Sequence, residues 1–588
     1  MRRFVAAGLV VSALAGGPVA AADGDAAFEA LAARYLDELP ALSPITATSL
    51  GDHRYDDRLD DVGPQGRRDA LAFWRRYEAE LQGIDRSSLS KPNQIDAALL
   101  ANQIGSSLWS LRELQEWAWN PVQYTQLAGS SIYGLMAREF APLEERLASV
   151  AARLEAMPTF LQQVRQTLDP ARVPKIHAET ALSQTPGLIS ILENMVVPEL
   201  DGLSPELKGR LEHAIAATRT AVDEQRRWLE EELVPNANGE FRIGAQKFDR
   251  KLAFALDSPL SRAEIRERAE SEYRRVREEM YRVALQVYRG KYPLVEVSDQ
   301  PTPEFEQAVT RAALEEAYRH LPGRDQIVPL AKEYLEQATE FVREKDLVEV
   351  PDDPLEIKIM PEFQRGVAVA YCDSPGPLDK GQKTFYVVAP LPDDWTEQQV
   401  ESFLREYNLY SLQDLTIHEA MPGHYLQLAL SNRYPSVLRS TLYSGSFVEG
   451  WAVYAERIMV DAGYLDFDPL MRLINLKWYL RAVVNAMIDQ AIHVDGMTRE
   501  EAMRLMVEGG FQEEREAAGK WVRAQLSSTQ LSTYFVGYQE HVDLRKAVEA
   551  AWGEDFSQRR YHDALLSYGS PPAKYVRAML LEEPVPGT

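Results

Sequence analysis

The sequence of 588 residues contains a single cysteine, Cys372. One thiol cannot form an internal disulfide, so the small disulfide-stabilised scaffolds are excluded and stability must come from a large hydrophobic core. Basic residues are scarce relative to acidic ones, 64 against 89, and the formal net charge is -25. This charge repels phosphate backbones, so we expect no nucleic-acid partner and favour small molecules, peptides or sugars.

Long hydrophobic runs are also scarce, and the one near the N-terminus is too short to cross a bilayer comfortably. Two arginines precede an apolar run over residues 4–15, and a Gly-Gly-Pro break and three alanines at 20–22 follow it. This order is typical of a signal peptide, so we predict one over residues 1–22 and a periplasmic or secreted mature protein. No cysteine follows the alanines to carry a lipid anchor, and we expect no stable membrane insertion.

The remaining pattern predicts a mainly α-helical fold. Apolar residues recur at three- and four-residue steps from Ala26 to about Leu347, and a capping-type Ser261-Arg262-Ala263-Glu264 predicts a long helix from Ser261 to Tyr288. Three β-prone runs interrupt the helices and predict one small antiparallel sheet: Ile357–Met360, Val367–Tyr371 and Thr384–Val388. Helices return from Glu397 onward. We expect one continuous large domain of two lobes, residues 23–350 and 351–588.

The densest group of chemically active residues is His418, Glu419, His424 and, 25 positions later, Glu449. A catalytic zinc ion takes three protein ligands such as imidazole and carboxylate, and it leaves a fourth position for water. His418, His424 and Glu449 supply such a set, and Glu419 stays free to act as a general base. The sequence therefore predicts a Zn²⁺ site.

The spacing of the two histidines requires a bend in the chain. His424 stands six positions after His418, and on a regular helix this turns the second imidazole about 120° away from the first. Pro422 breaks the helical hydrogen bonding and Gly423 tolerates unusual dihedrals, so we expect the helix to end there and His424 to return toward His418. Glu456 lies seven residues after Glu449, on the same helical face, and is predicted to hydrogen-bond a ligand histidine.

Three strings in the second half resemble a known family. They are His-Glu-Ala-x-Pro-Gly-His at 418–424, Glu-Gly-Trp-Ala-x-Tyr-x-Glu at 449–456, and Tyr534-x-x-Gly537 followed by Leu544-Arg545. They are similar to the bacterial domain of unknown function 885, itself similar to helical gluzincin peptidases such as angiotensin-converting enzyme and neurolysin. The resemblance runs from about Tyr35 to the C-terminus. It implies a helical zincin-like fold in which residues 23–350 form one wall of a deep channel and residues 351–588 form the catalytic lobe.

The resemblance also gives roles to residues near the C-terminus. One stripe of a predicted helix carries Tyr534, Tyr538, His541 and Arg545. Gly537 lies beside this stripe and permits close approach of a neighbouring segment. In helical gluzincins a tyrosine and a histidine from a late helix stabilise the oxyanion, and Tyr534 and His562 are the candidates here. Arg545 and Tyr538 are the candidates for binding substrate, Arg545 as a clamp for a terminal carboxylate. An edge strand, Val367–Tyr371 or Thr384–Val388, is expected to pair with an extended peptide.

These features predict an exported zinc metallopeptidase that hydrolyses short or unfolded peptides. Two alternatives stay open: a binding protein that holds metal or peptide without turnover, and a metal-dependent hydrolase of another amide or ester. Other chemistries lack their motifs, since the sequence has neither a G-x-S-x-G nucleophile elbow nor a G-x-G-x-x-G loop for a dinucleotide. Cys372 is expected to be a spectator, and the sequence leaves the oligomeric state open.

Overall fold

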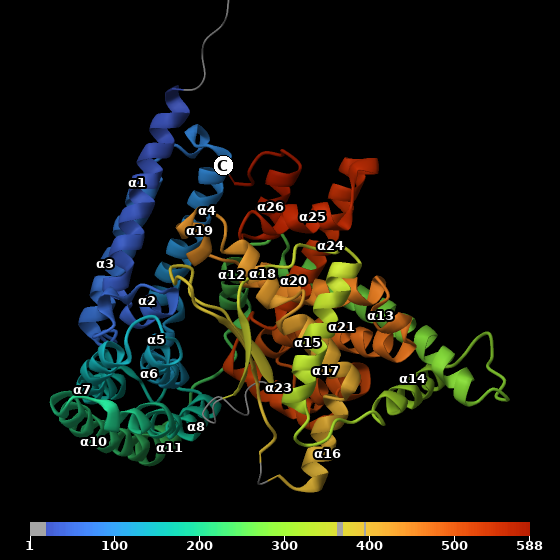
Figure 1. The fold of residues 1–588 in the computed structure, drawn as a ribbon, viewed down its shortest axis with the longest axis horizontal. Helices are drawn as coiled ribbons and strands as arrows, with labels where there is room; N and C mark the ends of the chain where they lie inside the picture. Colours follow the sequence, from blue (N-terminus) through green and yellow to red (C-terminus); the bar gives the residue numbers. More distant parts are fainter. Residues whose placement is uncertain (1–18, 361–368, 393–394, 588) are drawn as a thin grey trace, which may run out of the picture.

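The computed structural model describes residues 19–360, 369–392 and 395–587, and Figure 1 shows a mainly helical chain around one small sheet. Of the predicted signal peptide, residues 1–18 lie outside the described residues. The helices of the first half are α1 (Val19–Leu42), α2 (Pro44–Leu50), α3 (Pro64–Gln82), α4 (Lys91–Trp109), α5 (Glu116–Trp119), α6 (Pro121–Met136), α7 (Leu143–Thr167), α8 (Lys175–Gln184), α9 (Gly187–Ile191), α10 (Pro205–Trp228), α11 (Val234–Asn236), α12 (Gly244–Leu256), α13 (Arg262–Lys291), α14 (Pro303–Ala317) and α15 (Ile327–Glu344).

The second half begins with the sheet and continues with helices to the C-terminus. The strands are β1 (Leu355–Ile359), β2 (Ala370–Asp373) and β3 (Thr384–Val388). The helices are α16 (Glu397–Glu406), α17 (Leu409–Glu419), α18 (His424–Ser431), α19 (Val437–Thr441), α20 (Gly445–Asp461), α21 (Pro469–Gln490), α22 (Arg499–Arg504), α23 (Glu514–Leu526), α24 (Ser532–Trp552), α25 (Gln558–Leu566) and α26 (Ala573–Leu580). The prediction of a mainly α fold with one small sheet is confirmed.

Local sequence explains the limits and packing of the long helices. The predicted helix near residue 261 is α13, which begins with a capping box in which Ser261 and Glu264 cap each other's backbone N–H groups. In α15 the buried side chains recur every three or four residues and form one apolar stripe: Ile327, Ala331, Tyr334, Ala338 and Val342. Helices of this kind bury one face and leave the other to solvent.

Buried apolar side chains gather in several clusters along the chain. One cluster joins α1, α3 and α4, and another joins α6 to α10; these are the blue to teal helices of Figure 1. The largest cluster extends from Phe248 to Val576 and includes residues of α12–α15 as well as the sheet and the later helices. The helices at 244–344 therefore share one core with the second half, and this core crosses residue 350.

The sheet is mixed, with the strand order β1-β3-β2. β2 pairs antiparallel with β3, with Ala370 opposite Val388, whereas β1 pairs parallel with β3, with Leu355 opposite Thr384. The prediction of a purely antiparallel sheet is wrong for β1, because β3 inserts between β1 and β2. Since β3 has a neighbour on both sides, it cannot be the edge strand that accepts a peptide. Of the other predicted run, Val367 and Ala368 lie outside the described residues, and residues 370–373 form an edge strand.

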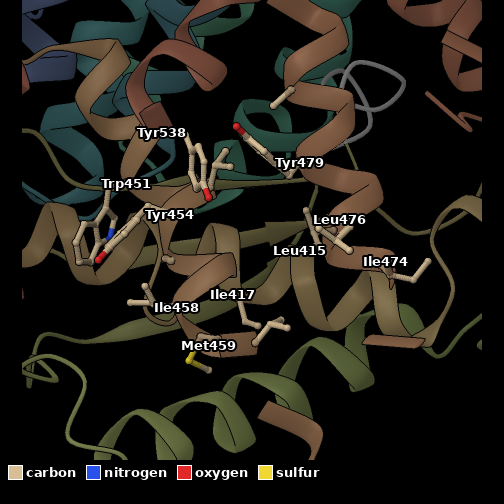
Figure 2. Close-up of a cluster of buried hydrophobic side chains, with 14 of the residues drawn as sticks. Leu415, Ile417, Trp451, Tyr454, Ile458, Met459, Ile474, Leu476, Tyr479 and Tyr538 are labelled. Carbon is tan, nitrogen blue, oxygen red and sulfur yellow. The ribbon is translucent and has the colours of Figure 1, made fainter. Parts of the chain in front are cut away.

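The helix that carries the first histidine, α17, lies in the interior of the protein. Its residues from Ser411 to Glu419 are all buried. Figure 2 shows Leu415 and Ile417 of α17 within an apolar cluster that includes Ile458 of α20 and Leu476 of α21. Close packing of this kind fixes side-chain positions, so the chemically active residues of α17 are held on a rigid support.

Candidate metal centre

The chain turns sharply between the two histidines. Helix α17 ends at Glu419 and α18 begins at His424, with a cis peptide bond between Met421 and Pro422. A Cβ atom on Gly423 would lie 1.8 Å from the carbonyl oxygen of His418, so no other residue fits the turn without displacing the backbone. The indole N–H of Trp451 donates to the carbonyl of Pro422 (2.9 Å) and ties the turn to α20. The predicted bend is confirmed.

The turn and α20 together bring three candidate ligands to one point. Nε2 of His418 lies 3.7 Å from Oε2 of Glu449, and Nε2 of His424 lies 3.5 Å from the same oxygen. Ligand atoms of the three residues lie within 4.8 Å of one another. The histidine side chains are 11% exposed and that of Glu449 is 25% exposed, so the group keeps some contact with solvent.

This donor set fits Zn²⁺. Two atoms bound about 2.0–2.1 Å from a tetrahedral ion lie roughly 3.3 Å apart, close to the separations from Glu449 to each histidine. Two imidazoles and one carboxylate are also the donor types of catalytic zinc sites. Burial alone would raise the pKa of the Glu449 carboxyl, but the adjacent His418 and His424 outweigh burial and hold this pKa far below its usual range. Glu449 is therefore a carboxylate that carries the negative charge a cation needs.

Behind His418 lies a buried acidic pair. Nδ1–H of His418 donates to Oε1 of Glu456 (2.6 Å), which leaves Nε2 directed toward the other candidate ligands. Asp414, one turn before His418 on α17, is close to Glu456 and accepts a hydrogen bond from Asn475 (3.3 Å). Burial and the adjacent Glu456 raise the pKa of Asp414 well above its usual value. The sequence analysis predicted Glu456 but missed Asp414, although its position four residues before His418 is the available signal.

Glu419 lies beside the candidate ligands without belonging to them. The backbone N–H of Cys372 in β2 donates to its Oε2 (3.0 Å), which fixes the carboxylate at the edge of the sheet. Burial raises the pKa of Glu419 above its usual value, although the adjacent His418 and His424 oppose this. A carboxyl whose pKa is raised in this way is better suited to take up a proton than an exposed one. Cys372 contributes its backbone here.

Tyr534 reaches the same region from α24. A Cβ atom on Gly450, the residue after Glu449, would lie 2.2 Å from the carbonyl carbon of Gly537, so α20 and α24 cross in close contact. Tyr534 lies one turn before Gly537, and burial together with the charge of Glu449 raises the pKa of its phenol. The close approach predicted at Gly537 is confirmed.

The hydrogen bonds of Tyr534 leave its proton available. Its hydroxyl oxygen accepts from Nη2 of Arg523 (3.0 Å) and from Nε2 of Gln530 (3.2 Å). Within the described part of the chain, no acceptor for the O–H is found. A phenol that accepts two hydrogen bonds and keeps its own proton is a good donor for developing negative charge.

The other predicted residues of the late helices lie in packed surroundings. Arg545 donates to the hydroxyl of Tyr454 (3.2 Å), which donates to Nε2 of His562 (3.0 Å), and Nδ1–H of His562 donates to the carbonyl of Leu347 (2.7 Å). His562 is fully buried, and burial lowers its pKa to about 3. Both of its ring nitrogens are therefore occupied, and the tyrosine hydroxyl holds Arg545.

Two further residues of the predicted stripe also serve packing. The ring of Tyr538 lies against that of Tyr479, with centroids 4.4 Å apart, and Figure 2 shows the two side by side. His541 is buried, and its Nε2–H donates to the carbonyl of Phe447 (2.9 Å). Of the stripe, Tyr534 is thus the member placed to meet a ligand at the candidate metal centre.

The fold and the site define a mainly helical protein with a buried His-His-Glu cluster beside the edge of a small sheet. The chain belongs to the family described as bacterial protein of unknown function (DUF885), whose model matches residues 44–580. This confirms the predicted family. The relation to gluzincin peptidases stays a prediction.

Two solved structures have the same fold. One is described as a "putative lipoprotein of unknown function" from Shewanella oneidensis; it is 34% identical, the alignment covers 94% of this chain and 99% of the other, and the TM-score is 0.79. The other is described as a "putative lipoprotein" from Colwellia psychrerythraea, with 19% identity, coverage of 95% and 99%, and a TM-score of 0.76. No curated protein matches the sequence. Among the described residues, no helix has the length and apolar character needed to span a membrane.

Proposed function

We propose that this protein is an exported zinc metallopeptidase that hydrolyses short or unfolded peptides. The observation that carries the proposal is the meeting of His418, His424 and Glu449 beside Glu419, a carboxylate that is not itself one of the candidate ligands. A site that only stored metal would gain nothing from this fourth group. The predicted signal peptide and the description of both structural relatives as putative lipoproteins support export.

Each side chain of the site has its own role in the proposed reaction. His418, His424 and Glu449 would hold the ion, and Glu456 would keep His418 in the tautomer that presents Nε2. When bound, zinc supplies Lewis-acid polarisation of a carbonyl and acidifies water. Glu419 takes the proton of the attacking water and returns it to the leaving amine, and Tyr534 donates to the oxygen on which negative charge develops.

The position of β2 favours a peptide as the substrate. The N–H of Cys372 donates to Glu419 and not to β3, so the outer edge of β2 lies beside the proposed base. An extended peptide that added to this edge would pass the candidate metal centre. A folded protein rarely offers such a strand without the cost of local unfolding.

The test combines metal content with digestion of peptides. Elemental analysis of protein purified without added metal should find about one zinc per chain. The same preparation should cleave a mixed peptide library, read by mass spectrometry, and should leave a tightly folded protein intact. A protein that carries zinc but cuts no peptide would contradict the proposal and favour binding without turnover. Cleavage of esters or other amides alone would indicate a different hydrolase.

A further inference from the structure

Arg523 lies beside the candidate metal centre and is a cation that has no acidic partner among the described residues. It is exposed on α23, and its Nη2 donates to Oε1 of Gln530 (2.9 Å) and to the hydroxyl of Tyr534 (3.0 Å). Among the residues that the structure describes, no carboxylate lies within 4.0 Å of its guanidinium, although the protein as a whole is strongly acidic. Because Arg523 is exposed, the remaining N–H groups of its guanidinium are accessible to a ligand.

The charges around Arg523 do not neutralise it. Lys520, one turn earlier on α23, is buried, and its Nζ lies 3.9 Å from Oε1 of Glu516. Glu516 is also the partner of Arg481, so one carboxylate serves two cations. A second carboxylate near Lys520 is Glu406, and it is held by Lys477 at 2.8 Å. Burial and the charge of Arg481 lower the pKa of Lys520 well below its usual value, so the positive charge offered at this end of α23 is that of Arg523. An anion that arrived there would replace no ion pair among the described residues.

Arg523 and the candidate metal centre are linked through one side chain. Tyr534 accepts a hydrogen bond from Arg523, and the crossing of α20 and α24 at Gly450 and Gly537 holds Tyr534 near Glu449. When a phenol donates a hydrogen bond to a reacting oxygen, the two oxygen atoms lie about 3 Å apart. The guanidinium is therefore roughly 6 Å from that oxygen, and a carboxylate bound on its outer side is roughly 6–9 Å away.

We propose that Arg523 binds a carboxylate of the peptide substrate, about two to three residues from the bond that is cut. An extended peptide advances about 3.3 Å per residue, so this distance corresponds to two or three residues. The inference rests on the proposed function and narrows it to peptides with a carboxylate near the scissile bond. The source is either the C-terminus, which would make the enzyme remove short C-terminal fragments, or an Asp or Glu side chain.

The experiment compares three matched peptides: a free C-terminal acid, its C-terminal amide, and that amide with Glu substituted two residues after the cut. Binding is measured by calorimetry in the Glu419→Gln background, so that peptides stay intact, and kcat/KM is measured in the active enzyme. The variants are Arg523→Gln and the control Arg515→Gln. The control removes one exposed arginine from the same helix, about 12 Å along its axis.

We expect one of the two carboxylate peptides to bind about 10- to 100-fold more tightly than the plain amide, as charge-assisted hydrogen bonds do. The peptide that binds more tightly than the plain amide shows whether the carboxylate comes from the C-terminus or from a side chain. Arg523→Gln should reduce this ratio to near one in both binding and kcat/KM, and Arg515→Gln should preserve it. Tyr534→Phe should lower kcat for all three peptides and leave the ratio intact.

Equal binding of all three peptides, or a ratio that survives Arg523→Gln, would overturn the inference. So would a loss of affinity in Arg523→Gln that is the same for acid and amide, because Arg523 would then act only through Tyr534. If the ratio depends on Arg523 in binding but the active enzyme cuts none of the peptides, the carboxylate site stands and the proposed peptidase activity fails.

Discussion

Gly450 on α20 and Gly537 on α24 meet with their backbones in contact, so that a Cβ atom on Gly450 would lie 2.5 Å from the Cα of Gly537. Helices normally pack with their axes 8–10 Å apart because side chains separate them, and two glycines allow a closer approach. The approach has a chemical consequence. Glu449 precedes one glycine and Tyr534 lies one turn before the other, so this crossing determines how far the phenol is from the candidate metal centre.

Gly537→Ala is predicted to disturb this crossing. The new Cβ would lie 1.9 Å from the carbonyl oxygen of Ser446, so the helices must move apart. We expect a loss of about 1–3 kcal/mol in the free energy of unfolding, measured by urea denaturation, and a lower kcat as Tyr534 withdraws. The matched control is Gly519→Ala on α23, where nothing lies within 4 Å and alanine should stabilise by up to about 1 kcal/mol. A Gly537→Ala variant as stable as the wild type would refute the close crossing.

His424→Ala is predicted to abolish tight zinc binding. A three-ligand site that loses one imidazole keeps only His418 and Glu449, and the turn at Pro422 and Gly423 would no longer serve a ligand. Zinc per chain after dialysis, measured by elemental analysis, should fall from about one to near zero. His213→Ala on α10, an exposed histidine, is the control and should retain the metal. Equal zinc content in His424→Ala and the wild type would exclude His424 as a ligand.

Glu419→Gln is predicted to separate binding from turnover. Glutamine keeps an oxygen that can accept from the N–H of Cys372 but cannot take up a proton. Zinc content and peptide affinity should therefore persist, while kcat falls about 100-fold or more. The exposed Glu401 on α16 offers the control Glu401→Gln, which should leave kcat unchanged. A zinc-loaded Glu419→Gln enzyme with normal kcat would show that another group is the base.

The sequence predicts the candidate metal centre better than its surroundings. The reason is that the bend at the centre depends on residues close in sequence, whereas the surroundings depend on contacts between distant parts of the chain. The bend depends on residues that are close in sequence: His418, Pro422, Gly423 and His424. Their residue types alone therefore predict a bend that brings two imidazoles together. The parallel pairing of β1 depends on which strand inserts beside it, a choice made by packing across the whole sheet. The resemblance to gluzincins suggested His562 as a donor at the site, but a resemblance cannot tell whether an imidazole lies in a cleft or, as here, has both nitrogens bonded inside the core.

Arg523 illustrates the opposite case, a residue that sequence reasoning missed. It lies on a charge-rich helix, where arginines usually form ion pairs with nearby acids. Within the part of the chain that the structure describes it has no acidic partner, and this feature and its hydrogen bond to Tyr534 appear only after α23 and α24 are placed side by side. Asp414 was missed for the same reason, because only the fold brings Asn475 and Glu456 close to it.

His53 connects the first part of the chain to the turn between β2 and β3. It lies in the short 3-10 helix His53–Tyr55, bonds Asp56 through Nδ1 (2.9 Å) and Asp379 through Nε2 (3.4 Å), and stacks on Phe140 with ring centroids 3.6 Å apart. Burial alone would lower its pKa, but the two carboxylates outweigh it and raise the pKa to about 9. An unfolded histidine has a pKa of about 6.5, so the folded state binds the proton more tightly than the unfolded state.

This difference in proton affinity makes the contribution of His53 to stability depend on pH. The stabilisation by charged His53 is fully present below about pH 6.5, where both states are protonated, and is lost as the pH rises through about 9. His53→Gln should therefore cost roughly 1 kcal/mol at about pH 6, a modest value because the side chain is partly exposed, and much less at about pH 10. Urea denaturation of both proteins at the two pH values measures the effect, and His213→Gln controls for the loss of an exposed imidazole. A cost for His53→Gln that is the same at both pH values would mean that stacking on Phe140, and not the charge, provides the stabilisation.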